Sequence, residues 1–234
     1  MSRILLGALQ PGARPIGIGV TGARRGTADF GGQHRGVIVK GGSSDEIAAE
    51  CFCALLANDL HVQAPVCGLV RDPDDGSILF ASVDMQTPNL MQALSMTAQP
   101  TPEEFRALAQ ELAGWLGFGR LLALDVLMQN ADRNAGNLLT DGVDWWAIDH
   151  ARALGLHPWK GHPLYRLVCQ SCDAMVGAGV EAAAVSNALT FAPGCHILSE
   201  QDLVHVGLPA HAAHFAGQII AKLPKVAATM SAML

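Results

Sequence analysis

Short runs of β-branched and other apolar residues, separated by turn-forming residues, dominate the first third of the chain. The segment between the first two runs, residues 22–35, is rich in Gly and Arg and is typical of a turn-rich connector. The first two runs therefore predict a hairpin, and the turn sequence at residues 72–76 separates the other two. Together the runs predict a small, mainly antiparallel sheet with strands at residues 15–21, 36–40, 66–70 and 78–83.

One helix is predicted within this sheet region. Apolar side chains recur at helical spacing from residue 45 to about residue 60. Ser43 or Ser44 precedes this pattern and is suited to cap the helix. Asp45 and Glu46 lie in the first turn, at the positive end of the helix dipole. We therefore assign Glu46 to the start of the helix, as a cap or dipole partner.

The pattern changes near residue 84, where proline and polar residues replace the β-branched runs. The stretch that follows indicates a linker with one or two helical turns. Thr101, with Pro102 after it and Glu104 three residues beyond the cap, predicts the start of a helix. The nearly all-apolar run at residues 121–128 predicts a second, buried helix.

Beyond the buried run, a tight turn at Asp141-Gly142 predicts a short hairpin between residues 137–139 and residues 145–148. Further helices are predicted over residues 164–175, over residues 181–189 and from residue 200 onward. We therefore expect an α+β protein of two units. The first, residues 1–84, is small and β-rich with one helix, and the second, residues 85–234, is mainly helical.

The composition says more about which partners the protein can bind than about its fold. The chain has 234 residues and is 50% hydrophobic, so it can bury one sizeable core or two small ones that share a cleft. With 15% charged residues and a formal net charge of -6, it lacks the basic surface that binds nucleic acid. It has no apolar run of about 18 residues, so we expect no membrane span. The first apolar stretch is too short for a signal peptide, so we expect a cytoplasmic protein.

The cysteines are expected to be reduced, since the chain shows no export signal. One spacing suggests a metal as an alternative. Cys169 and Cys172 form a CxxC pair, and Cys195-His196 lies downstream, a set that is conceivable for structural zinc. A single CxxC on a predicted helix is more often two neighbouring buried thiols, and we favour that interpretation.

The most informative chemistry lies in residues 130–152, NADRNAGNLLTDGVDWWAIDHAR. Asp132 and Asn137 lie five residues apart in a polar loop, and Asp149 follows the apolar run that ends the predicted hairpin. A phosphotransferase needs, in this order, a carboxylate near the acceptor hydroxyl, an amide oxygen on Mg²⁺ and a second carboxylate on the metal. The alternative is that Asp132 and Asn137 form turns and that Asp149 caps a helix.

The first unit supplies a cation and a carboxylate for such a site. Lys40 ends a predicted strand, and Glu50 lies on the helix that follows, among Ala, Cys and Phe residues. Because an apolar neighbourhood disfavours an unpaired carboxylate, Glu50 is expected to point inward at a partner. The alternatives are a solvated lysine at a strand edge and a glutamate on the helix surface.

A phosphate-covering loop and an adenine pocket complete the prediction. Residues 17–22 match GxGxxG, but the match falls largely inside a predicted strand and no helix follows, so a dinucleotide-binding fold is not supported. The turn that begins at Gly22 is the alternative covering loop, with Arg24 and Arg25 near the nucleotide. A flexible hairpin tip with solvated arginines is equally consistent with the sequence. The adenine end of the cleft would be lined by Phe80, Val83 and Met85, unless these side chains belong to the core.

A family resemblance follows from these residues. In chain order, Lys40, Glu50, residues 130–137 and residues 148–152 resemble the HipA-like kinases and, more distantly, the phosphatidylinositol kinases and actin-fragmin kinase. The resemblance covers about residues 14–152. Three departures are visible. Asn134 replaces the histidine common in such loops, and Asp149-His150-Ala151 stands where ordinary protein kinases have Asp-Phe-Gly. Lys40 and Glu50 are also only ten residues apart, so their pairing must be tight or be made by another carboxylate.

The resemblance implies a two-lobed protein-kinase-like fold with ATP in the cleft. It also implies that Lys40 contacts the phosphates and pairs with Glu50, that Asp132 lies near the acceptor hydroxyl, and that Asn137 and Asp149 bind Mg²⁺. Residues and resemblance together favour an ATP- and Mg²⁺-dependent phosphotransferase acting on Ser or Thr hydroxyls of a protein. Two alternatives stay open, a nucleotide-binding pseudokinase or interaction module and a kinase for a small molecule. An antitoxin-like protein partner is implied by kinship alone.

Overall fold

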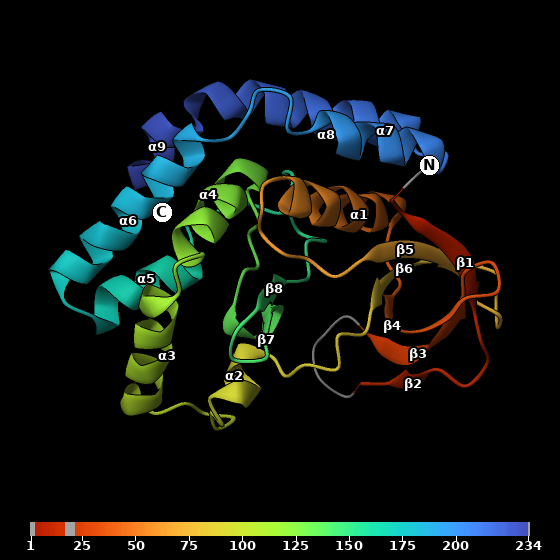
Figure 1. Ribbon diagram of the computed structural model, residues 1–234, viewed down its shortest axis with the longest axis horizontal. Helices are drawn as coiled ribbons and strands as arrows, with labels where there is room; N and C mark the ends of the chain where they lie inside the picture. Colours follow the sequence, from red (N-terminus) through yellow and green to blue (C-terminus); the bar gives the residue numbers. More distant parts are fainter. Residues whose placement is uncertain (1–2, 17–21, 234) are drawn as a thin grey trace.

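The computed structural model describes residues 3–16 and 22–233, and it combines a β-sheet region with a larger helical part (Figure 1). Within these residues, six strands form one sheet in the order β1-β5-β6-β4-β3-β2, and β1 also pairs with β3. The sheet therefore closes on itself as a small barrel, and β2 pairs with the first residues of β3 on the same edge that β1 pairs with at the end of β3. The strands are β1 (Leu5–Leu9), β2 (Arg14–Pro15), β3 (Arg24–Asp29), β4 (His34–Lys40), β5 (Cys67–Arg71) and β6 (Ile78–Val83).

Two glycines allow the barrel to close. A Cβ atom on Gly7 of β1 would collide with the carbonyl oxygen of Asp29, and one on Gly68 of β5 would lie 2.8 Å from the carbonyl oxygen of Leu5. Without these side chains, β1 approaches β3 and β5 closely. The barrel interior is filled by small and branched apolar side chains, namely Leu9, Ala28, Val37, Val39, Val70, Leu79 and Ala81.

The prediction that residues 22–35 form a connector is wrong. β3 occupies residues 24–29 of that segment and pairs with β4 over its whole length. The inward positions of β3 include Gly26 and Ala28, which are too small to give a strand its usual apolar alternation. The predicted strand at residues 15–21 lies mostly outside the described residues, and β1 has no counterpart among the predicted strands.

The helical part begins with a short linker helix after β6 and ends with three helices that run back across the molecule (Figure 1). Its elements are α2 (Leu90–Ala93), α3 (Pro102–Gly114), α4 (Phe118–Met128), η1 (Ala135–Asn137), β7 (Leu138–Thr140), β8 (Trp145–Ala147), α5 (Pro163–Ser171), α6 (Ala174–Leu189), α7 (Ile197–His205), α8 (Pro209–Lys222), η2 (Leu223–Lys225) and α9 (Val226–Met233). The predicted hairpin at Asp141-Gly142, the linker helix and the buried helix are all confirmed. The unit boundary at residue 84 stays a prediction, and β6 ends one residue before it.

One predicted helix is too long. Residues 164–175 do not form a single helix, because α5 ends at Ser171 and Cys172 is extended. The Asp173 side chain then accepts a hydrogen bond from the Met175 N–H at 2.8 Å and caps α6. The helix predicted at residues 181–189 is therefore the second half of α6, which begins at Ala174.

The predicted helix caps are confirmed. The helix after β4 is α1 (Ser44–Asp59), and Ser43 and Glu46 exchange hydrogen bonds at its start as a capping box. Thr101 and Glu104 form the same arrangement at the start of α3, with Pro102 in its first turn. Glu46 is therefore engaged at the helix start, as assigned, and Glu50 is left as the carboxylate that faces inward.

The helix α1 lies between the barrel and the last helices. It contacts β5 and β6 on one side and α7 and α8 on the other (Figure 1). All residues from 48 to 57 are therefore buried. Arg3 fastens this arrangement, since its Nε lies 2.6 Å from Asp202 Oδ2 on α7 and its Nη1 lies 2.5 Å from Asp59 Oδ1 on α1.

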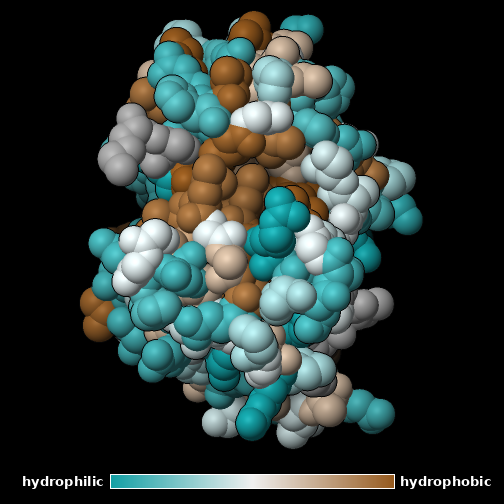
Figure 2. Space-filling model, turned by 90° about the vertical axis from the view of Figure 1, so that its right-hand side faces the viewer, coloured by the Kyte–Doolittle hydropathy of each residue, from teal (hydrophilic) through white to brown (hydrophobic). Residues whose placement is uncertain are grey.

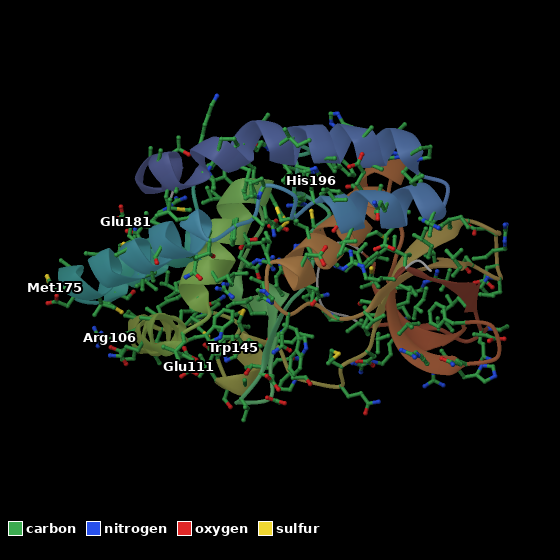
Figure 3. All side chains as sticks on the ribbon, turned by 45° about the horizontal axis from the view of Figure 1, so that its top comes forward. Arg106, Glu111, Trp145, Met175, Glu181 and His196 are labelled. Carbon is green, nitrogen blue, oxygen red and sulfur yellow. The ribbon has the colours of Figure 1, made fainter. Side chains whose placement is uncertain are left out.

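The helix α4 lies in the middle of the helical part, and all of its residues except Arg120 are buried. Trp145 of β8, labelled in Figure 3, shares the core with α4. The Trp145 ring stacks on Trp115 with ring centroids 4.5 Å apart, and Trp115 in turn lies against Phe118 of α4. Trp145 is buried and belongs to the main core. No helix of the described residues is long and apolar enough to cross a membrane.

Apolar side chains also gather in a groove on the face formed by the barrel and the link between α7 and α8 (Figure 2). Leu6 and Ile78 are 57% and 45% exposed there. The other apolar side chains that line the groove are Ile47, Leu69, Val206 and Leu208. The residues predicted to bind a nucleotide are not part of this lining.

Candidate active site

Three predicted site residues meet at the end of β4. Lys40 is the last residue of this strand, and its Nζ lies 3.3 Å from Glu50 Oε1 on α1 and 3.0 Å from Asp149 Oδ1. All three side chains are largely shielded from solvent, with 15%, 3% and 22% of their surface exposed. The structure thus joins the lysine of the sheet region to a carboxylate of the helical part, 109 residues further along the chain.

The charges of this cluster stabilise one another. Burial opposes the charged form of Lys40, but the carboxylates of Glu50 and Asp149 outweigh burial and raise the lysine pKa. Burial likewise opposes ionisation of Asp149, and the charge and hydrogen bond of Lys40 outweigh it and lower the pKa of this carboxyl. Burial raises the pKa of Glu50 against the attraction of Lys40. Lys40 is therefore a firmly protonated cation held between two acidic side chains.

Glu50 also holds the backbone beside Asp149. Its Oε2 accepts a hydrogen bond from the His150 N–H at 2.7 Å, while its Oε1 faces Lys40. Asp149 itself has a φ of 64°, in the left-handed region that residues other than glycine rarely adopt. Backbone strain of this kind is concentrated at functional sites. The bond from His150 to Glu50 fixes this turn and so determines where the Asp149 carboxylate points.

Asp132 and Asn137 lie together in the loop between α4 and β7. Asn137 Nδ2 donates to the carbonyl oxygen of Asp132 at 2.8 Å, and Asn134 accepts from the Gly136 N–H at 2.8 Å to start η1. The Asp132 carboxylate, 40% exposed, lies 3.4 Å from Arg152 Nη1. The loop thus presents one carboxylate to solvent, and the amide nitrogen of Asn137 points into the loop.

The two groups of site residues are connected by a residue that the sequence analysis did not single out. Arg133 is fully buried, and its Nη1 donates to the carbonyl oxygens of Asn137 and Ile148, at 3.0 and 2.6 Å. Its guanidinium also pairs with Asp125 of α4, at 2.9 Å from Nε to Oδ2. A signal for this network was present in the sequence, because Asp125 stands alone in an otherwise apolar run and a buried carboxylate needs a partner.

His150 and His162 complete the buried polar network. Arg133 Nη2 lies 3.2 Å from His150 Nδ1, and His162 Nε2 lies 3.1 Å from Asp125 Oδ2. Burial, reinforced by the nearby charge of Arg133, lowers the pKa of His150 to about 3. His150 is therefore a neutral ring beneath the cluster, while Asp125 carries the negative charge that balances Arg133.

The donor set of the site suits a magnesium ion. Because Asn137 uses its amide nitrogen as a donor within the loop, its amide oxygen is left to serve as a ligand, and Asp149 offers a carboxylate. Mg²⁺ prefers such hard oxygen atoms and is usually bound by one or two carboxylates together with water and substrate phosphates. Among residues 3–16 and 22–233, no three His, Cys, Asp or Glu side chains gather as a metal-binding group. Asn137 and Asp149 are thus the two predicted residues whose oxygen atoms could hold such an ion.

The remaining predicted residues surround this site less closely. Phe80 pairs with Lys40 across β4 and β6, and its side chain is buried in the main core. Val83 and Met85 are half-buried where the chain leaves β6. Gly22 lies two residues before β3 with a φ of 62°, and residues 17–21 of the glycine motif lie outside the described residues.

Arg24 and Arg25 have carboxylate partners of their own. Arg24 pairs with Asp72, and Arg25 Nε lies 2.7 Å from Asp84 Oδ2. Both arginines are thus bound to the barrel. The cysteines considered for zinc differ in their exposure to solvent. Cys169 is exposed on α5, Cys172 is half-buried at the end of that helix, and Cys195 is buried.

The barrel, its single helix and the cluster around Lys40 define a protein of kinase-like fold. The crystal structure of a Helicobacter pylori proinflammatory kinase, CtkA, matches the chain with a TM-score of 0.61 over 99% of both chains, at 13% sequence identity. No protein-family model matches the sequence, and no curated protein matches it. The likeness at this identity establishes the fold.

Proposed function

We propose that the protein is an ATP- and Mg²⁺-dependent phosphotransferase whose acceptor is an alcohol. The observation that carries this proposal is the position of Lys40, whose Nζ lies within 3.3 Å of both Glu50 and Asp149. Kinases need a lysine on the phosphates that is oriented by a helix glutamate, beside a carboxylate that binds the metal. The kinase-like fold supports the same assignment.

Each side chain has a distinct part in the proposed reaction. Lys40 binds phosphate oxygens of ATP, and Glu50 orients Lys40 and the turn at residue 150. Asp132 accepts the proton of the acceptor hydroxyl, whose oxygen forms a bond to the γ-phosphorus as the bond from that phosphorus to the β–γ bridging oxygen breaks and ADP leaves. Asn137 and Asp149 hold Mg²⁺, which supplies charge neutralisation and orientation of the phosphates when bound.

The finer parts of the proposal rest on the sequence resemblance. We assign the protein to the HipA-like kinases, with a Ser or Thr hydroxyl of a protein as acceptor and an antitoxin-like protein as its partner. The exposed carboxylate of Asp132 supports an acceptor that approaches from the surface. Phosphoproteomics after expression of the wild type and of Asp132→Asn tests this class of acceptor, since sites lost only in the variant identify protein substrates.

A direct test combines two substitutions at the site with one control. Asp132→Asn and Lys40→Met should each lower ATP turnover by about 10²-fold or more, because each removes a charge that acts on the reacting groups. Lys225→Met, at the exposed end of η2, is the matched control for loss of a lysine and should leave turnover unchanged. Full turnover in both site variants would exclude the kinase assignment.

A second candidate is a nucleotide-binding module without transfer activity. The observation in its favour is the ion pair between Arg152 and Asp132, which occupies the proposed proton acceptor. Titration with Mg·ATP followed by thermal shift, together with an autophosphorylation assay, separates the two functions. Stabilisation by the nucleotide without any phosphate transfer would support the module, whereas transfer to any hydroxyl would exclude it.

A further inference from the structure

Among the residues that the structure describes, Arg133 is the largest completely buried side chain. A buried guanidinium is unfavourable unless its donors are paired, and each of its five N–H bonds has an acceptor here. Two of them go to the carboxylate of Asp125, at 2.9 and 3.2 Å. This bidentate pair balances the charge and fixes the plane of the guanidinium.

The other three donors point at the candidate site. Nη1 donates to the carbonyl oxygens of Asn137 and Ile148, and Nη2 donates to the ring of His150. Asn137 is one proposed metal ligand, and Ile148 and His150 flank the other, Asp149. The carbonyl of Asn137 also accepts a hydrogen bond from the Ile148 N–H at 3.1 Å. The guanidinium of Arg133 therefore bridges the backbone of residue 137 and the backbone of residues 148–150 where these two segments are hydrogen-bonded to each other.

The contact with His150 also determines how that ring is protonated. Arginine has only donors, so Nδ1 of His150 must accept and its ring proton must lie on Nε2. The backbone N–H of the same residue donates to Glu50, which in turn faces Lys40. Arg133 is thus connected, through His150 and Glu50, to the lysine that lies in the sheet region.

We propose that Arg133 is the positioning residue of this site, setting the separation of Asn137 from Asp149 by binding the backbone on both sides. This inference rests on the proposed function. A lysine cannot replace the arginine, because an ammonium lacks the planar fork that reaches Asp125, two carbonyl oxygens and a ring nitrogen at once.

The test uses Arg133→Lys with Arg3→Lys as the matched control. Arg3 also spans two carboxylates, Asp59 and Asp202, so its replacement removes the same kind of fork away from the site. Manganese affinity is measured by electron paramagnetic resonance in the presence of a non-hydrolysable ATP analogue. We expect Arg133→Lys to weaken manganese binding by about tenfold or more, as for other residues that orient metal ligands, and Arg3→Lys to leave it unchanged.

A second readout does not depend on metal or nucleotide. Amide hydrogen exchange at Ile148 and His150 should become about tenfold faster in Arg133→Lys, because both amides lie in the segment that the arginine holds. If Arg133→Lys fails to fold, Asp125→Asn, which keeps the shape of the anchor but removes its charge, should give the same change in exchange. Unchanged exchange at both amides would overturn the inference.

The two readouts separate this inference from the proposed function. A wild-type protein that binds no manganese with the nucleotide analogue overturns the proposed function, and the exchange rates then still decide whether Arg133 couples the two segments. Faster exchange with unchanged manganese affinity overturns the role of Arg133 at the metal site, because the coupling would then have no effect on the ligands.

Discussion

Asp149 combines a charged side chain with a backbone conformation that most residues avoid. Its φ of 64° places it in the left-handed region, which Asp and Asn tolerate better than other non-glycine residues because their short side chains bond locally. Position 149 therefore has two separate requirements, a negatively charged side chain and a residue that tolerates a left-handed backbone. Substitutions can satisfy one without the other.

We predict different consequences for two replacements of Asp149. Asp149→Asn should abolish ATP turnover while keeping the free energy of unfolding within about 1 kcal/mol of the wild type, since Asn accepts the left-handed backbone. Asp149→Ala should also be inactive but should be less stable than Asp149→Asn, because Ala is strained in this conformation by about 1 kcal/mol. Urea unfolding of the three proteins measures the difference, and equal stabilities of the two variants would contradict it.

At the scale of single residues, the sequence identifies the side chains proposed to do chemistry better than the side chains that position them. Lys40, Glu50 and Asp149 could be predicted to meet, because their types and order match a known requirement and Glu50 lies in an apolar neighbourhood. Arg133 could not, because an arginine in a polar loop has no local mark of burial. Its role depends on Asp125, His162 and the backbone of a hairpin, which only the folded chain brings together.

Among the elements, the barrel depends on close backbone approach. Gly7 has no room for a side chain, because a Cβ atom there would collide with the backbone of Asp29 and with the ring of Phe30. The strand β1 pairs with β5 along its length and with β3 at its end, so a displacement at residue 7 separates both pairings.

Gly7→Ala should therefore destabilise the protein by about 2 kcal/mol or more, in the range of overpacked sites. Gly217→Ala is the control, because this glycine lies on the exposed side of α8 with nothing near its Cβ position. Removing a glycine from a helix should stabilise it, by up to about 1 kcal/mol. Opposite shifts in melting temperature are expected, and a Gly7→Ala protein as stable as the wild type would show that the barrel can open at β1.

A substitution at the start of α3 should change stability without affecting the candidate site. Thr101→Ala removes the side chain that accepts from the Glu104 N–H and should lower the free energy of unfolding by about 1 kcal/mol. Manganese affinity and ATP turnover should not change, since α3 contributes none of the site residues. A loss of turnover in this variant would indicate that the linker and α3 affect the site indirectly.

Elements with a local chemical signature were predictable and the others were not. Capped helices such as α1 and α3 begin at a Ser or Thr with a Glu three residues later, a signal within one turn. The strand β3 has no such signal, because its inner face is built from Gly26 and Ala28 and its membership in the sheet is decided by β1, β2 and β4. The break between α5 and α6 occurs because Asp173 caps α6. This cap was not predicted from the sequence, because apolar residues continue at helical spacing across it.

At the scale of the whole molecule, the buried network around Asp125 should make the free energy of unfolding decrease at low pH. Burial opposes ionisation of Asp125, but the charge of Arg133 and the bond to His162 outweigh it and hold its pKa below the usual range. A carboxyl whose pKa is lower in the folded than in the unfolded state contributes stability above the unfolded pKa, about 3.9, and loses it as the pH falls towards the folded pKa.

We therefore expect Asp125→Asn to be less stable than the wild type by about 3 kcal/mol or more at neutral pH, because Arg133 is left buried without its counter-charge. The difference in melting temperature between the two proteins should stay constant down to about pH 5 and shrink below about pH 4, where Asp125 of the unfolded wild type takes up a proton. Calorimetry across this range measures it. A difference that grows below pH 4 would contradict the assigned direction of the pKa shift.

The ion pair between Arg3 and Asp202 affects how the chain folds during its synthesis on the ribosome. The two residues are 199 positions apart, so their ion pair cannot form until Asp202 has been synthesised, roughly 10 to 40 s after Arg3 at typical synthesis rates. Until then α1 lacks the cover of α7 and α8, and its buried face is open to other chains. A nascent chain stalled before α7 should therefore recruit chaperones that bind apolar helices, and release of the full-length chain should end their association.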